Sequence, residues 1–159
     1  MPVEPAIGAL LDRVAITDAL YRYGSCIDRR DAAGLRAVLA NDVRAQYGNR
    51  EPVVGADALV QWIDESTRGC LWQHHLLSVY EVEIDGDSAR ALVYHTSHRV
   101  FEDDPSTVHV VVGRYHDRLR RRPDGWQIGE LLLEILWAER RTDATGYLEA
   151  AGGRGPDVP

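Results

Sequence analysis

Apolar residues in the first third of the chain recur with the spacing of an amphipathic helix. Ile16, Leu20, Tyr23 and Ile27 follow an i, i+4, i+7, i+11 pattern, which places them on one stripe of a helix. This stripe predicts a helix over residues 8–29. Shorter apolar patterns predict a second helix over residues 32–40, a strand over residues 43–47 and a third helix over residues 55–68.

From residue 72 onward apolar positions tend to alternate with polar ones, which is the period of β-strands. Turn residues such as Asp85-Gly86-Asp87 and Pro123-Asp124-Gly125 divide this half of the chain. Four strands are predicted, over residues 72–84, 89–101, 107–119 and 126–137. Long strands joined by short turns form an antiparallel meander. Helices followed by such a sheet predict an α+β domain, in which the helices cover one face of a strongly curved sheet.

Length and charge favour one soluble domain. The 159 residues fit a single core. We expect the domain to span residues 1–142, with the Gly- and Pro-rich residues 143–159 forming a flexible tail. The net charge of −7 argues against nucleic acid as a partner. No apolar run has membrane-spanning length and no signal-peptide pattern opens the chain, so we expect a cytoplasmic protein with no membrane partner.

The residue types restrict the chemistry further. All 18 basic residues are arginines, so Schiff-base chemistry through a lysine side chain is excluded. Cys26 and Cys70 have neither zinc-site nor redox spacing, and we expect both to be free thiols. The sequence also lacks a Walker loop, a GxGxxG turn after a strand, an HExxH pair and a GxSxG elbow. We therefore expect neither a metal site nor another cofactor.

Asp28 lies at the C-terminal end of the first predicted helix, one position past its apolar stripe. The helix dipole disfavours a carboxylate at this end, which hints that another interaction keeps it there. From spacing alone, however, a solvated carboxylate at a helix end is the commoner explanation.

All six histidines lie on the predicted sheet, which is compatible with a pocket that holds acid and base groups. His74 and His75 are adjacent in the first long strand, so one of them must point toward the concave side. Alternation counted back from Val82 and Ile84 selects His74, whereas a bulge would select His75. The pattern alone leaves both possible.

Residues 14–31, VAITDALYRYGSCIDRRD, resemble the first helix of SnoaL-like proteins, which share the fold of the nuclear-transport-factor-2-like superfamily. The resemblance extends over about residues 10–140 through four shorter segments, at residues 75–79, 85–89, 113–117 and 124–128. It implies a cone-shaped, curved antiparallel (mixed) sheet that wraps around a pocket covered by three N-terminal helices.

Within this superfamily the site pattern is most similar to those of scytalone dehydratase and bile acid 7α-dehydratase. Asp28 matches the aspartate that these enzymes place at the end of the first helix. Counting back from the turn at residues 85–87 to their strand histidine selects His75. The same resemblance implies catalytic roles for Tyr47, His98 and Tyr23.

The resemblance also implies a cofactor-independent hydro-lyase that removes water from a small hydrophobic cyclic substrate, similar to a polyketide or a steroid. His75 would be the general base, oriented by Asp28, and His98 would protonate the departing hydroxyl group. Tyr47 and Tyr23 would hold the enolate oxygen. From position in the predicted strands alone, five further residues are expected to form the pocket wall, namely Trp72, Val100, Tyr115, Trp126 and Leu132.

Two alternatives remain at this point. A cyclase or isomerase would use the same Asp28–His75 dyad, and only its products would differ. A non-catalytic small-molecule binder, or a small subunit of a ring-hydroxylating dioxygenase, would instead keep the two side chains apart. The apolar run at residues 131–137 predicts an interface strand, and hence a homodimer or homotrimer.

Overall fold

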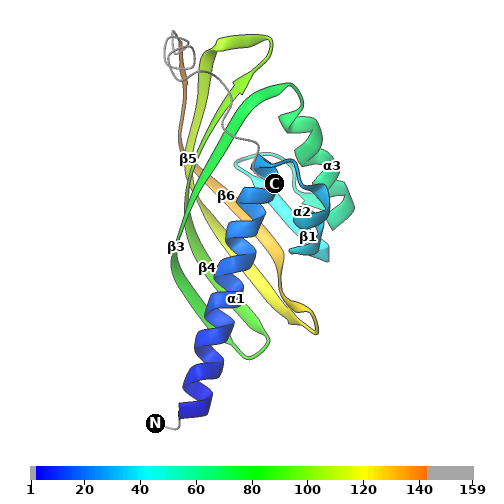
Figure 1. Cartoon of the computed structure of the whole chain (residues 1–159), viewed down its shortest axis with the longest axis vertical. Coiled ribbons are helices and arrows are strands. Elements are labelled where there is room, and N and C mark those ends of the chain that lie inside the picture. Colours follow the sequence, from blue (N-terminus) through cyan, green and yellow to red (C-terminus); the bar gives the residue numbers. More distant parts are fainter. Residues whose placement is uncertain (1–2, 143–159) are drawn as a thin grey trace.

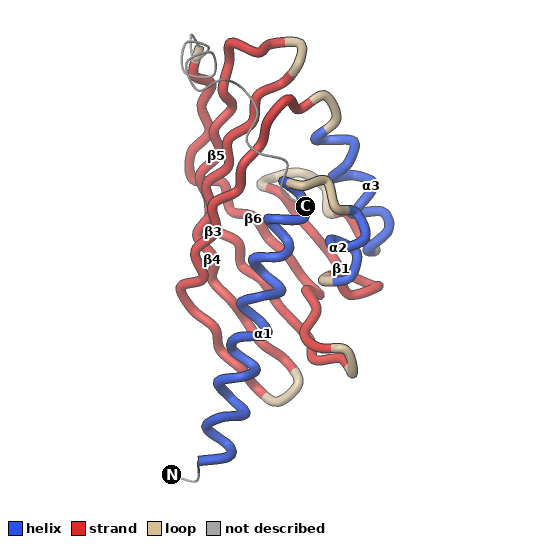
Figure 2. The backbone as a smooth tube through the Cα atoms, viewed as in Figure 1, coloured by secondary structure: helices blue, strands red, loops and turns tan. Residues whose placement is uncertain are grey.

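The helices come before the long strands along the chain and gather on one side of the sheet (Figure 1 and Figure 2). The computed structural model describes residues 3–142. The predicted tail at residues 143–159 lies outside this range. The helices are α1 (Val3–Asp28), α2 (Ala32–Ala37) and α3 (Ala56–Thr67). The strands are β1 (Leu39–Tyr47), β2 (Val53–Val54), β3 (Cys70–Asp85), β4 (Ser88–Phe101), β5 (Asp104–Arg122) and β6 (Gly125–Arg141).

The six strands form one mixed sheet in the order β2-β1-β6-β5-β4-β3. β1 runs parallel to β6, and every other neighbouring pair is antiparallel. β2 and β3 are the two edges, so the sheet is not closed. Its long strands curve (Figure 1). The predicted α+β class and the cone-shaped mixed sheet are confirmed. The two-residue strand β2 was not predicted, because so short a segment cannot show alternation.

The core lies between α1 and the concave face of the sheet. Ile16, Leu20, Tyr23 and Ile27 are all buried, which confirms the predicted stripe. They belong to one cluster with Val93 and other inward side chains of the long strands. Each large apolar side chain buried in this way contributes about 1.5–3 kcal/mol to stability. The same packing fixes the position of α1 against the sheet.

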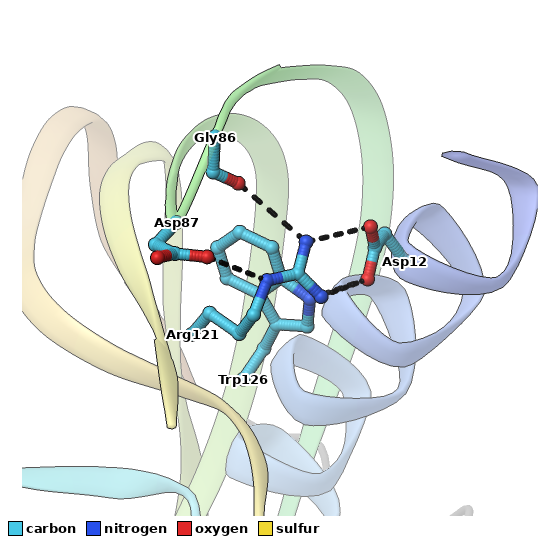
Figure 3. A network of polar contacts seen from close by, with 5 residues as sticks. All are labelled: Asp12, Gly86, Asp87, Arg121 and Trp126. Carbon is cyan, nitrogen blue, oxygen red and sulfur yellow. Dashed lines mark hydrogen bonds and ion pairs between the residues drawn. The ribbon is translucent and has the colours of Figure 1, made fainter. Parts of the chain in front are cut away.

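A cluster of polar contacts joins the first half of α1 to the turns of the sheet (Figure 3). Both carboxylate oxygens of Asp12 accept hydrogen bonds from the guanidinium of Arg121, at 2.5 and 2.7 Å. The indole of Trp126 donates a third bond, at 3.1 Å, and Arg121 also donates to Asp87 at 2.9 Å. The bonds from Arg121 and then Trp126 lower the pKa of Asp12 to about 2. Beyond this cluster the N-terminal turns of α1 extend past the strands (Figure 1).

A bulge in β3 decides which of its residues face the core. The pairing of β3 with β4 shifts between Val79 and Glu81. Because of this extra residue, Leu77 and Val79 share the inner face with Val82 and Ile84, although their positions differ in parity. Residues of odd number before the bulge therefore point inward, and His75 is one of them.

The convex face of the sheet carries exposed apolar side chains. Near the end of β6 these include Leu132, Leu136 and Trp137. The prediction of a homodimer or homotrimer through this strand stays a prediction. No helix among residues 3–142 combines the length and the hydropathy required to cross a bilayer.

Candidate active site

Asp28 and His75 are joined by two hydrogen bonds at the end of α1. Asp28 Oδ1 lies 2.6 Å from His75 Nδ1, and Asp28 Oδ2 accepts a bond of 2.8 Å from the backbone N–H of His75. The His75 side chain is only 2% exposed, while that of Asp28 is 21% exposed. With Nδ1 bonded to the carboxylate, Nε2 is the imidazole nitrogen left to face a ligand.

Local sequence explains why Asp28 reaches this position. The chain turns away just beyond it, since Arg30 has a left-handed φ of 56° and Asp31 caps α2 by accepting a bond from the Gly34 N–H at 2.8 Å. One turn earlier in α1, Gly24 permits close approach of the helix to β3. A Cβ atom at this glycine would lie 2.8 Å from Leu77 Cδ1. The small residue therefore lets the carboxylate of α1 meet the strand directly.

Tyr23 and Tyr47 place two hydroxyl groups together beside the dyad. Their phenolic oxygens lie 2.5 Å apart. Tyr115 packs edge-on against Tyr23 with 6.0 Å between ring centres, and Trp62 stacks on Tyr47 at 4.6 Å. Burial raises the pKa of both Tyr23 and Tyr47. The two phenols therefore stay protonated at neutral pH. One of them donates to the other, so one O–H is left to donate a hydrogen bond to an oxygen of a ligand.

His95 is a second imidazole next to the dyad. Its ring centre lies 5.5 Å from that of His75 and 5.0 Å from that of Tyr115. Burial is the main cause that lowers the pKa of His95 to about 3, with the neighbouring His75 and Arg99 adding to it. Both of its ring nitrogens are buried without a hydrogen-bond partner among residues 3–142. At neutral pH His95 is therefore a neutral group with one donor and one acceptor to offer.

These groups open onto a cavity of about 480 Å³. Its size falls within the range of small-molecule sites. Apolar and aromatic side chains supply about half of its lining. The lining residues are Tyr23, Ile27, Tyr47, Arg50, Trp62, Ile63, Ser66, Thr67, His75, His95, Ser97, Arg99, Phe101, His109, Val111, Tyr115, Leu133 and Ile135. Of the residues predicted from the sequence, Tyr23, Tyr47, His75 and Tyr115 line it, and Asp28 stands behind His75.

His98 is not brought to this cavity. His75 is paired with Ser97 across β3 and β4, so His95 and Ser97 face the same side and His98 faces the other. His98 instead lies opposite His74, with 6.3 Å between ring centres, and 6.4 Å from the Trp72 ring. This geometry leaves no place for His98 in the expected proton transfer, and it puts the predicted wall residue Trp72 on the convex face.

The other three predicted wall residues also lie away from the cavity. Val100 is buried but has the parity of His98, so it does not line the cavity. Leu132 is exposed on the convex face, and its neighbour Leu133 lines the cavity instead. Trp126 donates to Asp12 in the cluster at the far end of the sheet. Strand position alone had suggested these residues, and strand position does not give the facing direction.

A sequence model of the SnoaL-like domain matches residues 8–131. The chain belongs to the SnoaL-like domain family. This SnoaL-like domain is 29% identical over 124 residues to an uncharacterized protein of Mycobacterium tuberculosis, a match that covers 77% of this chain and 84% of the relative.

Solved structures share the fold of this SnoaL-like domain. A hexachlorocyclohexane dehydrochlorinase of type 2 superposes with a TM-score of 0.80 at 12% identity, covering 97% of this chain and 99% of the other. A candidate scytalone dehydratase from Novosphingobium aromaticivorans superposes with a TM-score of 0.75 at 15% identity, covering 82% and 88% of the two chains. At these identities the likeness concerns the fold.

Several residues of the site were not singled out from the sequence. On β4 these are His95, Ser97 and Arg99, which alternate along the strand opposite His75. The period of the strand would have identified them once the inward direction of His75 was fixed. In the described part of this SnoaL-like domain, no three His, Cys, Asp or Glu side chains are grouped so that they could hold a metal ion.

Proposed function

We propose that this SnoaL-like domain is a cofactor-independent hydro-lyase that dehydrates a small hydrophobic cyclic substrate by general acid–base catalysis. The observation that carries the proposal is the Asp28–His75 pair, in which the free Nε2 of a buried imidazole faces a cavity lined about half by apolar and aromatic side chains. The names of two structural neighbours, a dehydrochlorinase and a candidate dehydratase, both denote eliminations and so support the same class of reaction.

In this proposal His75 removes a proton from a carbon atom next to a carbonyl group. The C–H electron pair forms the new double bond with the neighbouring carbon, and the C–O bond to the hydroxyl group breaks. Asp28 holds the imidazole in one tautomer and stabilises the imidazolium ion that forms. A base positioned in this way contributes about 10²–10⁴-fold to the rate.

The phenols of Tyr23 and Tyr47 are suited to the carbonyl oxygen of the substrate. Both remain protonated, and the O–H that is not used in the bond between them can donate to the negative charge that develops on this oxygen as the carbon loses its proton. The departing hydroxide then takes the proton from the His75 imidazolium and leaves as water. His98 is not needed for this step, and the apolar wall excludes solvent from it.

An isomerase of the same site is the second candidate, and the position of His95 favours it. A neutral imidazole 5.5 Å from His75 offers a second group that can return a proton to a different carbon. Product analysis separates the two reactions, because an elimination releases water and an isomerisation conserves the mass of the substrate.

The proposal is tested by assaying a panel of hydroxylated cyclic ketones with the wild-type protein and three variants. Asp28→Asn and His75→Ala should each lower kcat/KM by at least about 100-fold. His74→Ala is the matched control, because His74 is the adjacent histidine on the convex face and should leave turnover unchanged. If the two dyad variants turn over the substrate as fast as the control, the assignment of the base is wrong.

A further inference from the structure

The cavity is lined by positively charged side chains, although the chain as a whole has a net charge of −7. Two arginines, Arg50 and Arg99, line it together with three histidines. None of the described residues that line it is an aspartate or a glutamate. The nearby carboxylate of Asp28 is already bonded twice to His75. Any formal charge that the lining itself presents to a ligand is therefore positive.

Arg99 is held in this wall without a counter-ion. Its Nε atom is buried and has no hydrogen-bond partner in the described part of the chain. No ion pair found among residues 3–142 includes Arg99 or Arg50, whereas nine other arginines pair with carboxylates at the surface. The charge of Arg99 acts on the cavity, since it helps to lower the pKa of His95.

A half-buried guanidinium without a partner is unfavourable, because it has lost part of its hydration and gained no anion in exchange. A ligand that brings an anionic group to Arg99 removes this cost. Carboxylates suit the planar fork of a guanidinium, with which they form two parallel hydrogen bonds. Arg50 is exposed at the turn after β1 and lines the same cavity, so it can add a second positive charge to the same group.

We infer that the cavity binds a hydrophobic carboxylate anion, whose carboxylate is held by Arg99 and Arg50 while its ring system lies against the apolar wall. The inference rests on the proposed function of the same site and adds the class of substrate to it. The ring system faces side chains such as Trp62, Phe101 and Leu133.

The strand register also sets the spacing that such a substrate must have. His75 is paired with Ser97, and Arg99 lies two residues further along β4 on the same face. Two residues of a strand span roughly 7 Å. A spacing of this size is on the scale of a ring, and it suits a cyclic acid whose carboxylate and reacting carbon lie on opposite sides of that ring.

The test compares two probes that differ in charge but share a ring system, naphthalene-2-carboxylate and naphthalene-2-carboxamide. Binding of each to the full chain is measured by isothermal titration calorimetry at neutral pH. The wild-type protein should bind the carboxylate at least about 10-fold more tightly than the amide, as expected for hydrogen bonds between charged groups. Arg99→Gln should remove this preference and leave the affinity for the amide within about twofold.

Two further variants test whether the Arg99→Gln result comes from misfolding or from the loss of any positive charge. Arg99→Lys keeps the charge but loses the fork, and it should retain part of the preference. Arg44→Gln is the matched control, because Arg44 is an exposed arginine of β1 that does not line the cavity. This variant should bind both probes like the wild-type protein.

Equal binding of the two probes by the wild-type protein, or an unchanged preference in Arg99→Gln, overturns the inference. So does a wild-type dissociation constant for the carboxylate weaker than about 1 mM. His75→Ala separates the inference from the proposed function, because it should abolish turnover and keep the anion preference. If this variant keeps both, the proposed base is wrong and the anion site stands. If it loses the preference, the anion site is wrong.

Discussion

Asp117 is a carboxyl group that the fold buries without a compensating charge. It lies on β5 between Ala91 of β4 and Leu131 of β6, and it is only 4% exposed. Its Oδ1 atom has no hydrogen-bond partner among residues 3–142. Burial raises the pKa of Asp117 well above its ordinary value of 3.8. We therefore expect the folded protein to hold a proton on Asp117 at a pH at which the unfolded chain releases it.

The sign and size of the effect follow from linkage. A carboxyl group whose pKa is raised by folding makes the folded state bind more protons than the unfolded state, so the free energy of unfolding falls as the pH rises above 3.8. The fall is about 1.4 kcal/mol for each pH unit over which the two states differ by one proton. Asp117→Asn keeps the shape and has no proton to lose, so it lacks this term.

The measurement is urea unfolding of the wild-type protein and Asp117→Asn, followed by circular dichroism at two pH values. The free energy of unfolding of the variant, measured relative to that of the wild-type protein, should increase between about pH 4.5 and pH 5.5, by up to about 1.4 kcal/mol. Asp103→Asn is the control, because Asp103 is an exposed carboxylate. An advantage that is the same at both pH values would refute the reasoning, because burial of Asp117 would then not control its proton.

Two further predictions concern Asp12 and the tyrosine pair. The lowered pKa of Asp12, about 2, means that its bonds to Arg121 stabilise the fold above pH 3.8, and that this contribution is lost as the pH falls through about 2. The difference in Tm between wild type and Asp12→Asn should therefore shrink as the pH falls from about 4 to about 2 in thermal melts, and a constant difference would contradict this. Tyr47→Phe leaves the Tyr23 hydroxyl without its partner, so it should lower the free energy of unfolding by about 1 kcal/mol in urea titrations. The same variant should reduce kcat at least about 10-fold, and unchanged turnover would remove the tyrosine pair from the mechanism.

Much of the architecture could be predicted from the sequence, because it depends on local periodicity. The stripe from Ile16 to Ile27 fixed the buried face of α1, and the observed burial confirms it. The alternation after residue 72 and the Gly-containing turns indicated four long strands, all of which are present. The helical pattern also placed Asp28 at the end of the helix, but the resemblance to SnoaL-like proteins was needed to single it out as a site residue. The elements and their buried faces need only the period of one element.

The facing direction of the site residues was decided by the tertiary structure. A strand has a period of two, so a single bulged residue between Val79 and Glu81 moves His75 inward and His74 outward. The cross-strand pairing of His75 with Ser97 then turns His98 away. The residue pattern does not mark where a bulge falls or which strands meet.

The electrostatics of the cavity depend on the same assembly. In the sequence, nothing distinguishes Arg99 from the rest of the 18 arginines. It becomes distinctive only where the folded strands enclose it and leave its Nε atom without a partner. The sequence by itself thus determined the elements and the end of α1, where Asp28 lies. The tertiary structure decided which charges lose their water, because hydration is lost only when segments distant in the chain pack together.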